Sequence, residues 1–295
     1  MIRDDAIEWI HQQVKNVISV EVQQQWELST VLRVRTTSGD VFFKTGTPLA
    51  HSADEPRLLT LLACLYPDDV PDVIAADFEH GWLIISDVGV NLRDHSEYSL
   101  WHRALMRLAE LQHDSSWHLD ALIDAGCPDQ RTEHFDMEID AALANEAMLA
   151  SLEPDEIVHL RNLAPLLHAH NQALQRASLV HGDVHGGNMG YRDEQLRFID
   201  WSESCIGHPF FDLPVILRDA LAYFPLAQVD RLRDDYLACW GEEARLWPLA
   251  LPVAALHHAI DYNNVAELVA PDQPRVRVAR WLRQVIAAAN GTLTY

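Results

Sequence analysis

The spacing of apolar residues changes near residue 87, and this change limits the folds that the chain can adopt. Before it, short segments of alternating apolar and polar residues dominate, whereas most of the chain after it shows the spacing of amphipathic helices. A length of 295 residues is comfortable for two lobes. We therefore predict an α+β protein with a small antiparallel β-sheet lobe over residues 1–87 and a larger, mainly helical lobe over residues 88–295. A cleft between two lobes is a usual place for a ligand.

The small lobe is predicted to hold two helices and a sheet. Helical spacing of apolar residues predicts a helix near residues 4–16 and another over residues 55–65. Residues 37–40, Thr-Ser-Gly-Asp, predict a tight turn between two strands. The expected strands cover residues 18–22, 31–36, 41–44, 73–77 and 82–86.

Helical spacing dominates the large lobe, and strand signals there are short. Three such signals, at residues 179–180, 189–191 and 196–199, bracket the segment with the most distinctive chemistry. The expected helical stretches are residues 98–112, 135–175, 211–239 and 274–289.

Charge and cysteine content argue against several functional classes. Acidic residues outnumber basic ones 44 to 22, so a nucleic acid would be repelled and we expect no nucleic-acid partner. The same field attracts cations, although acidity also serves solubility alone. The four cysteines are scattered, which argues against a zinc site or a disulfide framework and favours a reducing compartment. The polar N-terminus is not a signal peptide, and the longest apolar run, residues 246–256, is too short to cross a bilayer. We expect a cytoplasmic protein with no membrane partner.

Residues 179–201 combine glycines, carboxylates and an asparagine in a way that indicates metal and phosphate chemistry. They predict a strand, a tight loop with Asp183 and Asn188, a hairpin, and Asp200 at the end of a further strand. Glycines in the loop permit sharp turns and close approach of a ligand. Asn and Asp oxygens suit Mg²⁺ beside nucleotide phosphates, and a carboxylate that holds no metal can accept the proton of an attacking hydroxyl. Phosphoryl transfer needs mainly such an oriented nucleophile and neutralised charge.

The full segment reads His181-Gly-Asp183-x-His-x-x-Asn188, then Ile199-Asp200-Trp201, and continues through Gly207-His-Pro209 to Phe211-Asp212-Leu213. This ordered run resembles the signature of the aminoglycoside phosphotransferase and choline kinase families, which are relatives of the protein kinases. The resemblance covers residues 179–213. It implies a protein-kinase-like fold and a Mg²⁺-dependent small-molecule kinase that moves the γ-phosphoryl group of ATP or GTP to a hydroxyl.

The resemblance also implies roles for the matched residues. Asp183 would orient and deprotonate the acceptor hydroxyl, while Asn188 and Asp200 would hold Mg²⁺. Asp212 would brace the catalytic loop by hydrogen bonds. His181 is interpreted as packing support for that loop, as is His185, because no further Cys or His pattern suggests that the two bind a metal.

Upstream residues stand where the resemblance requires them. Lys44 ends a strand and resembles the family lysine that contacts the α- and β-phosphates, and Glu55 resembles its ion-pair partner. Pro56 suits the first position of a helix, so Glu55 is expected at the helix start, where an ion pair with Lys44 is less strongly expected. The carbonyl of Ser86 and the N–H of Val88 correspond to hinge groups that bond the adenine edge.

The sequence departs from the family pattern at two places. No glycine occurs before Gly39, so the loop that covers the phosphates lies within residues 23–30 and lacks the flexible glycines of protein kinases. Ser29, or else Thr30, is the candidate for the phosphate contact, and an ordinary turn hydroxyl is the alternative. Ser202 stands where the family often has an acid, and the adjacent Glu203 is a substitute.

The sequence indicates the type of reaction but leaves several classes of acceptor molecule open. Glu203, His257 and Asp261 are candidates for the acceptor pocket, the last two within a polar cluster that also holds His258 and Tyr262. A satisfied buried histidine is the alternative interpretation of that cluster. Aminocyclitol antibiotics, amino alcohols such as choline, and sugar or nucleoside alcohols all remain open, and the acidity favours a cationic acceptor.

Two other functions stay open. A catalytically silent nucleotide-binding regulator of the same fold would explain the glycine-free loop, but it does not require the complete set of Lys44, Asp183, Asn188 and Asp200. A hydrolase with two metal ions between Asp183 and Asp200 would leave Lys44 and the order of the two lobes unexplained.

Overall fold

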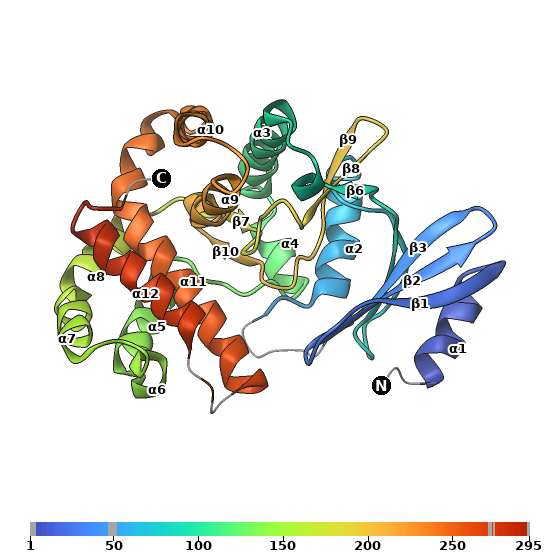
Figure 1. The fold of residues 1–295 in the computed structure, drawn as a ribbon, viewed down its shortest axis with the longest axis horizontal. Helices are drawn as coiled ribbons and strands as arrows, with labels where there is room; N and C mark the ends of the chain where they lie inside the picture. Colours follow the sequence, from blue (N-terminus) through green and yellow to red (C-terminus); the bar gives the residue numbers. More distant parts are fainter. Residues whose placement is uncertain (1–3, 47–51, 271–272, 274, 294–295) are drawn as a thin grey trace.

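The computed structural model describes residues 4–46, 52–270, 273 and 275–293. Residues 1–3 and residue 274, the first of the last predicted helix, therefore lie outside the described part. Figure 1 shows a small sheet at one end of the molecule and a larger, helical part at the other. The sheet is antiparallel, with strand order β1-β2-β3-β5-β4. Its strands are β1 (Val17–Gln25), β2 (Ser29–Thr36), β3 (Gly39–Gly46), β4 (Val73–Asp77) and β5 (Trp82–Ser86).

The two faces of this sheet pack against different helices because side chains alternate along each strand. One face meets α1 (Asp4–Gln13), and its core includes Phe43, Trp82 and Ile84. Leu83, which lies between the last two, points the opposite way and joins the main core with α2 (Glu55–Leu65). The predicted first helix ends three residues earlier than expected, whereas α2 has the predicted bounds.

A short strand ties the hinge to the large lobe. After the small lobe ends, β6 (Val90–Asn91) pairs with β8 (Met189–Arg192), which in turn pairs with β9 (Gln195–Phe198). Gly89 precedes this strand at φ +85°, and a Cβ there would lie 2.4 Å from the carbonyl oxygen of Tyr191. A glycine is therefore required where the chain passes from one lobe to the other.

Prolines break the long helical stretches that the sequence predicts. The stretch 135–175 consists of four helices, and Pro154 and Pro165 stand at the starts of two of them, where the missing N–H costs nothing. The helices of the large lobe are α3 (Tyr98–Ser115), α4 (Leu119–Asp124), α5 (Thr132–Ala144), α6 (Glu146–Leu149), α7 (Pro154–Asn162), α8 (Ala164–Ala173), α9 (Leu213–Ala220), α10 (Leu226–Ala238), α11 (Trp247–Val269) and α12 (Val276–Ala289), with the 3₁₀ turns η1 (Leu92–Asp94), η2 (Pro209–Phe211) and η3 (Gly241–Leu246).

Helices α11 and α12 pack against each other in the large lobe (Figure 1), and residues of both belong to its core. Strand β7 (Ser178–Val180) pairs with β10 (Cys205–Gly207), and both are fully buried. Among the described residues, no helix is long and apolar enough to cross a membrane.

Candidate active site

Three charged side chains from distant parts of the chain meet where the two lobes join. The Lys44 Nζ on β3 lies 2.6 Å from Glu55 Oε2, at the first residue of α2, and 2.5 Å from Asp200 Oδ1, just after β9. The Lys44 and Glu55 side chains are 14% and 10% exposed, whereas that of Asp200 is 44% exposed. The ion pair between Lys44 and Glu55, which was less strongly expected because Glu55 starts the helix, is therefore present. One side of the Asp200 carboxylate stays open to a ligand.

The electrostatics of this cluster keep its central pair charged. Burial alone would lower the pKa of Lys44, but the two neighbouring carboxylates raise it above its usual value. Burial alone would raise the pKa of Asp200, but the Lys44 ammonium holds it at about 2. Burial raises the pKa of Glu55, against the attraction of the same ammonium. Lys44 and Asp200 are thus both ionised at neutral pH.

Local backbone geometry holds Asp200 in place. Its φ of +66° is unusual for a residue with a side chain and marks a constrained turn. The Ser202 hydroxyl donates to Asp200 Oδ1 at 2.9 Å, and the Trp201 N–H donates to Glu55 Oε1 at 3.1 Å. The turn after β9 is in this way bonded to the first residue of α2.

Donors from the same loop surround the Asp183 carboxylate. The Asn188 Nδ2 donates to the Asp183 carbonyl oxygen at 2.9 Å and to its Oδ2 at 3.2 Å. The Gly187 N–H donates to His185 Nδ1, so His185 carries its proton on Nε2, which lies 3.3 Å from Asp183 Oδ2. His185, interpreted from the sequence as loop packing, therefore also faces the carboxylate.

Asp212 accepts hydrogen bonds from the start of the catalytic loop. Its Oδ2 accepts from the His181 N–H at 2.9 Å, and its Oδ1 accepts from the Gly182 N–H at 2.8 Å. Gln112 Nε2 donates to Oδ2 at 2.9 Å, and Gln112 accepts in turn from the Tyr236 hydroxyl. Burial raises the pKa of Asp212 to about 7, although the backbone N–H donors favour its charged form.

His181 links the two ends of the 183–200 hairpin. The side chain is completely buried, and its Nε2 donates to the carbonyl oxygen of Ile199 at 3.1 Å. The Asp183 N–H donates to the other ring nitrogen at 3.3 Å. Burial lowers the pKa of His181 to about 4, so the ring is neutral and both nitrogens serve the loop.

Two further residues fix the loop, and no local sequence pattern marks either of them. Asp219, in α9, accepts from the Gly186 N–H at 2.7 Å, and the Arg93 N–H donates to the Gly186 carbonyl at 2.9 Å. The guanidinium of Arg93 also lies 3.3 Å from Asp219 Oδ1.

The hinge and the first turn of the small sheet hold the residues expected to contact the nucleotide. Within the described residues nothing accepts a hydrogen bond from the N–H of Val88, although that residue is buried. Ser86 ends β5, and its hydroxyl accepts from the Asp72 N–H. Ser29 begins β2, directly after the turn of residues 26–28, and no hydrogen bond within the described part of the chain joins its hydroxyl to Lys44.

The proposed acceptor residues are gathered beside the catalytic loop. Burial raises the pKa of Glu203 well above its usual value, and the charges of Asp183, Asp261 and Asp200 add to that effect. His257 is 1% exposed, and its Nε2 lies 3.2 Å from Asp261 Oδ2. The structure thus brings three acidic side chains, Glu203, Asp261 and Asp200, near Asp183. Lys44 is the nearby cation, and its charge lowers the pKa of Glu203 against the effect of burial.

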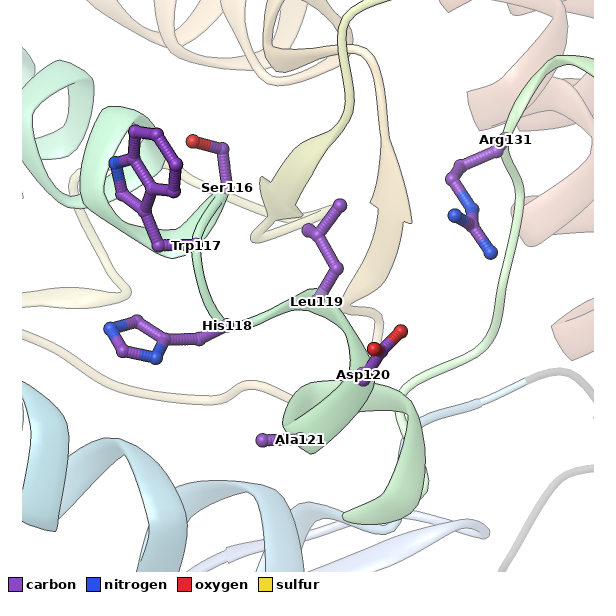
Figure 2. A pocket seen from close by; sticks show the side chains of 7 residues that line it. All are labelled: Ser116, Trp117, His118, Leu119, Asp120, Ala121 and Arg131. Carbon is purple, nitrogen blue, oxygen red and sulfur yellow. The ribbon is translucent and has the colours of Figure 1, made fainter.

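A separate hollow lies on the surface between α3 and α4. It has a volume of about 410 Å³ and is lined by residues 116–121 and by Arg131 (Figure 2). None of the residues expected at the active site lines it. Trp117 at its edge is 84% exposed.

A family of known proteins and several solved structures resemble this chain over most of its length. The model of a family described as "Phosphotransferase enzyme family" matches residues 20–253. A search of curated proteins found no significant relative. The choline kinase LicA from Streptococcus pneumoniae has a similar structure, with 15% identity, a TM-score of 0.68, and coverage of 97% of this chain and 99% of that one.

Two antibiotic-modifying proteins are also similar in structure. The spectinomycin phosphotransferase APH(9)-Ia, solved with ADP and spectinomycin, has 13% identity, a TM-score of 0.61, and coverage of 99% and 98%. APH(2")-IIia, solved with GDP and kanamycin, has 18% identity, a TM-score of 0.68, and coverage of 99% and 100%. At such identities the likeness shows the fold, and the predicted two-lobed, protein-kinase-like architecture is confirmed.

Proposed function

The chain belongs to the phosphotransferase enzyme family, and from that premise we propose that it transfers the γ-phosphoryl group of a Mg²⁺-bound nucleoside triphosphate to a hydroxyl of a small molecule. The contact of Lys44 with Asp200 across the two lobes is the observation that carries this proposal. It joins a cation suited to phosphates with a carboxylate suited to a metal, as phosphoryl transfer requires.

The residues that would hold Mg²⁺ fit a hard, oxygen-preferring cation. Asp200 offers an ionised and partly exposed carboxylate. Asn188 uses its amide nitrogen as a donor to Asp183, and within the described chain no hydrogen bond is made to its amide oxygen. When bound there, Mg²⁺ would neutralise charge on the nucleotide phosphates.

Asp183 is our candidate for the group that orients and deprotonates the acceptor hydroxyl. Asn188 donates a hydrogen bond to its Oδ2, and His185 Nε2 lies 3.3 Å from the same oxygen, so its second carboxylate oxygen is the one left for the acceptor. The hydrogen bond from Asn188 restricts the rotation of the carboxylate, and an oriented base is effective because little reorganisation is needed at the transition state.

The donor nucleotide would sit against the hinge. The N–H of Val88 is a donor without a partner among the described residues, and a purine ring nitrogen would accept from it, while the Ser86 carbonyl would accept from the purine edge. The structural neighbours were solved with ADP in one case and GDP in another, so ATP and GTP are both candidates. Lys44, held by Glu55, would contact the phosphates, and Ser29 is the candidate in the turn above them.

The acceptor is expected to carry positive charge. Glu203 and Asp261 stand near Asp183 in partly buried surroundings, and the charges that raise the pKa of Asp261 are all acidic. An amine or ammonium group on the acceptor would relieve this crowding. Choline, spectinomycin and kanamycin, named with the structural neighbours, each carry an amine or a quaternary ammonium group. His257 and Asp261, the other candidates for the acceptor pocket, have side chains that are only 1% and 13% exposed, so we assign the contact with the acceptor to Glu203.

Nucleotide turnover measured with and without a panel of cationic hydroxyl compounds tests the proposal. We expect Mg²⁺-dependent turnover that an acceptor stimulates. Asp183→Ala should lower turnover more than ~100-fold while nucleotide binding survives, since only the base is lost. Asp200→Ala should weaken the binding of Mg²⁺-nucleotide itself.

Asp193→Asn is the matched control for both substitutions, because that side chain is 90% exposed in the turn between β8 and β9. Unchanged turnover in the Asp183 variant would show that the catalytic loop is assigned wrongly. Nucleotide binding without turnover across the whole panel would favour the alternative, a catalytically silent regulator.

A further inference from the structure

Helix α11 carries three potential metal ligands, His257, His258 and Asp261. The proposed phosphoryl transfer does not need this set of three. His257 and His258 are 1% and 2% exposed, and the Asp261 side chain is 13% exposed. One ligand atom from each residue lies within 4.8 Å of the others. His257 and Asp261 are four residues apart, so they share one face of the helix.

Several polar atoms of this cluster lack partners. Both ring nitrogens of His257 and the Oδ2 of Asp261 are buried and make no hydrogen bond with any described residue. The His257 Nε2 and the Asp261 Oδ2 face each other at 3.2 Å without the alignment of a hydrogen bond. Buried polar atoms nearly always have a partner, so this arrangement indicates that a further species belongs between them.

His258 has the second contact that a metal-bound imidazole usually makes. Its Nε2 donates to the carbonyl oxygen of Phe211 at 2.7 Å, and since a carbonyl can only accept, the proton is on Nε2. The lone pair of Nδ1 is therefore available. Hydrogen bonding of the outer ring nitrogen to a backbone carbonyl orients metal-bound histidines in many proteins.

Aromatic packing and local charge both favour a cation at this place. His257 stacks on Phe211 with ring centroids 5.0 Å apart, and His258 packs on Trp281 at 4.7 Å, so both rings are held in position. The charged groups that interact with Asp261 include Glu138, Asp183 and Glu203, all acidic.

A nearby arginine does not supply the missing positive charge. The guanidinium of Arg218 lies over the ring of Trp281, 4.3 Å from its centroid, and acts on His258 rather than on Asp261. The Asp261 carboxylate thus has acidic neighbours and an unused oxygen.

We propose that His257, His258 and Asp261 bind one divalent transition-metal ion of the zinc class. Two imidazoles and one carboxylate are a typical set of three protein ligands for Zn²⁺, with water in the fourth position, whereas Mg²⁺ prefers oxygen ligands alone. Ligands ~2.1 Å from a tetrahedral ion are roughly 3.4 Å apart, close to the 3.2 Å between His257 Nε2 and Asp261 Oδ2. The remaining ligand atoms, which lie within 4.8 Å of one another, would have to approach by up to about 1.4 Å when the ion binds.

This ion is distinct from the Mg²⁺ of the proposed reaction. All three ligands lie on α11, so the ion would fix the orientation of the His258 ring. That ring already bonds to the carbonyl of Phe211, which directly precedes the Asp212 that accepts from the catalytic loop, so the ion would have a structural role.

Titration of the untagged, chelator-treated full chain with Co²⁺, in the presence of excess Mg²⁺, tests the proposal. We expect one equivalent of Co²⁺ to bind with the visible absorption of a tetrahedral site, and Zn²⁺ to displace it. Asp261→Asn and His257→Ala should each weaken binding at least ~10-fold. His80→Ala is the matched control, because His80 forms an exposed pair with Asp77 at 2.9 Å and reports adventitious surface binding.

Asp261→Asn preserves the shape of the side chain, so this variant decides the question even if His257→Ala does not fold. Its circular dichroism in chelator should equal that of the wild type, and Zn²⁺ should raise the melting temperature of the wild type alone. Absence of stoichiometric binding in the wild type, or equal binding in the wild type and Asp261→Asn, would overturn the proposal. Binding is read without turnover, and Asp200→Ala should leave it intact, so a failure here is separable from a failure of the proposed kinase activity.

Discussion

Replacing Gly182 with alanine tests whether backbone contact fixes the catalytic loop. The residue has φ +86°, and a Cβ added there would lie 2.1 Å from the carbonyl oxygen of Glu203 and 2.7 Å from its carbonyl carbon. Both are backbone atoms, so no change of side-chain rotamer relieves the clash. Cβ contacts essentially never fall below 3.0 Å, so the two segments must separate by about 0.9 Å.

The cost of this substitution can be separated into two parts. An alanine at left-handed φ costs about 1–2 kcal/mol, and forced separation of packed backbone adds about 1–3 kcal/mol. Gly241→Ala is the matched control, since Gly241 has φ +56° and nothing lies within 4 Å of its added Cβ. We expect Gly241→Ala to lower the free energy of unfolding by about 1–2 kcal/mol and Gly182→Ala by about 2–5 kcal/mol.

Urea unfolding of both variants measures these losses, and nucleotide turnover of the folded Gly182→Ala protein measures the displacement of Asp183. A shift of about 1 Å in a catalytic group can lower the rate ~100-fold, whereas Gly241→Ala should keep normal turnover. Equal unfolding free energies for the two variants, together with unchanged turnover, would refute the idea that the contact with Glu203 positions the loop.

Two further substitutions test the electrostatics. Lys44→Met should abolish most turnover. It should also lower the free energy of unfolding more at neutral pH than in acid, because without the ammonium Glu55 and Asp200 repel each other until one of them is protonated. Urea unfolding at pH about 5 and 8 measures this difference, and a loss of stability that is the same at both pH values would contradict it. Burial raises the pKa of Glu138 to about 7, above its ordinary value of 4.5, so its contribution to stability is complete below the ordinary value and is lost as pH rises through 7. In metal-free protein, the free energy of unfolding of Glu138→Gln should therefore rise relative to that of the wild type by about 1–3 kcal/mol as the pH increases from about 5 to 8. A difference between the two proteins that does not change with pH would show that this carboxyl group is not the cause.

The sequence predicted the small lobe better than the helical one because strands and turns there are marked locally. Pro56, the second residue of α2, marked the start of that helix at Glu55, and the hairpin strands near Asp200 were bounded by glycines and a turn. Helix α11 was not predicted as a whole, because it is apolar on nearly all sides and so has little helical periodicity. The stretch 135–175 was predicted as continuously helical, although prolines within it start new helices.

The site showed a similar division. Residues within the matched motif, such as Asp183 and Asp200, could be proposed from the sequence because their spacing is local. Gln112 and Asp219 were missed: Gln112 reaches Asp212 from 100 positions away, and Asp219 bonds to Gly186 across 33. Contacts at such separations depend on the packing of whole helices, and no short pattern in one sequence reports them.

The pairing of β6 with β8 limits where the chain between the two lobes can bend. Val90 and Asn91 pair with β8, so only the residues between Ser86 and Gly89 lie outside the strand pairing on either side. The loop with Asp183 and Asn188 directly precedes β8, so it lies on the large-lobe side of this connection. Lys44 lies on the sheet side, so a change of angle here would alter the distance between Lys44 Nζ and Asp200 Oδ1, which is 2.5 Å in this structure.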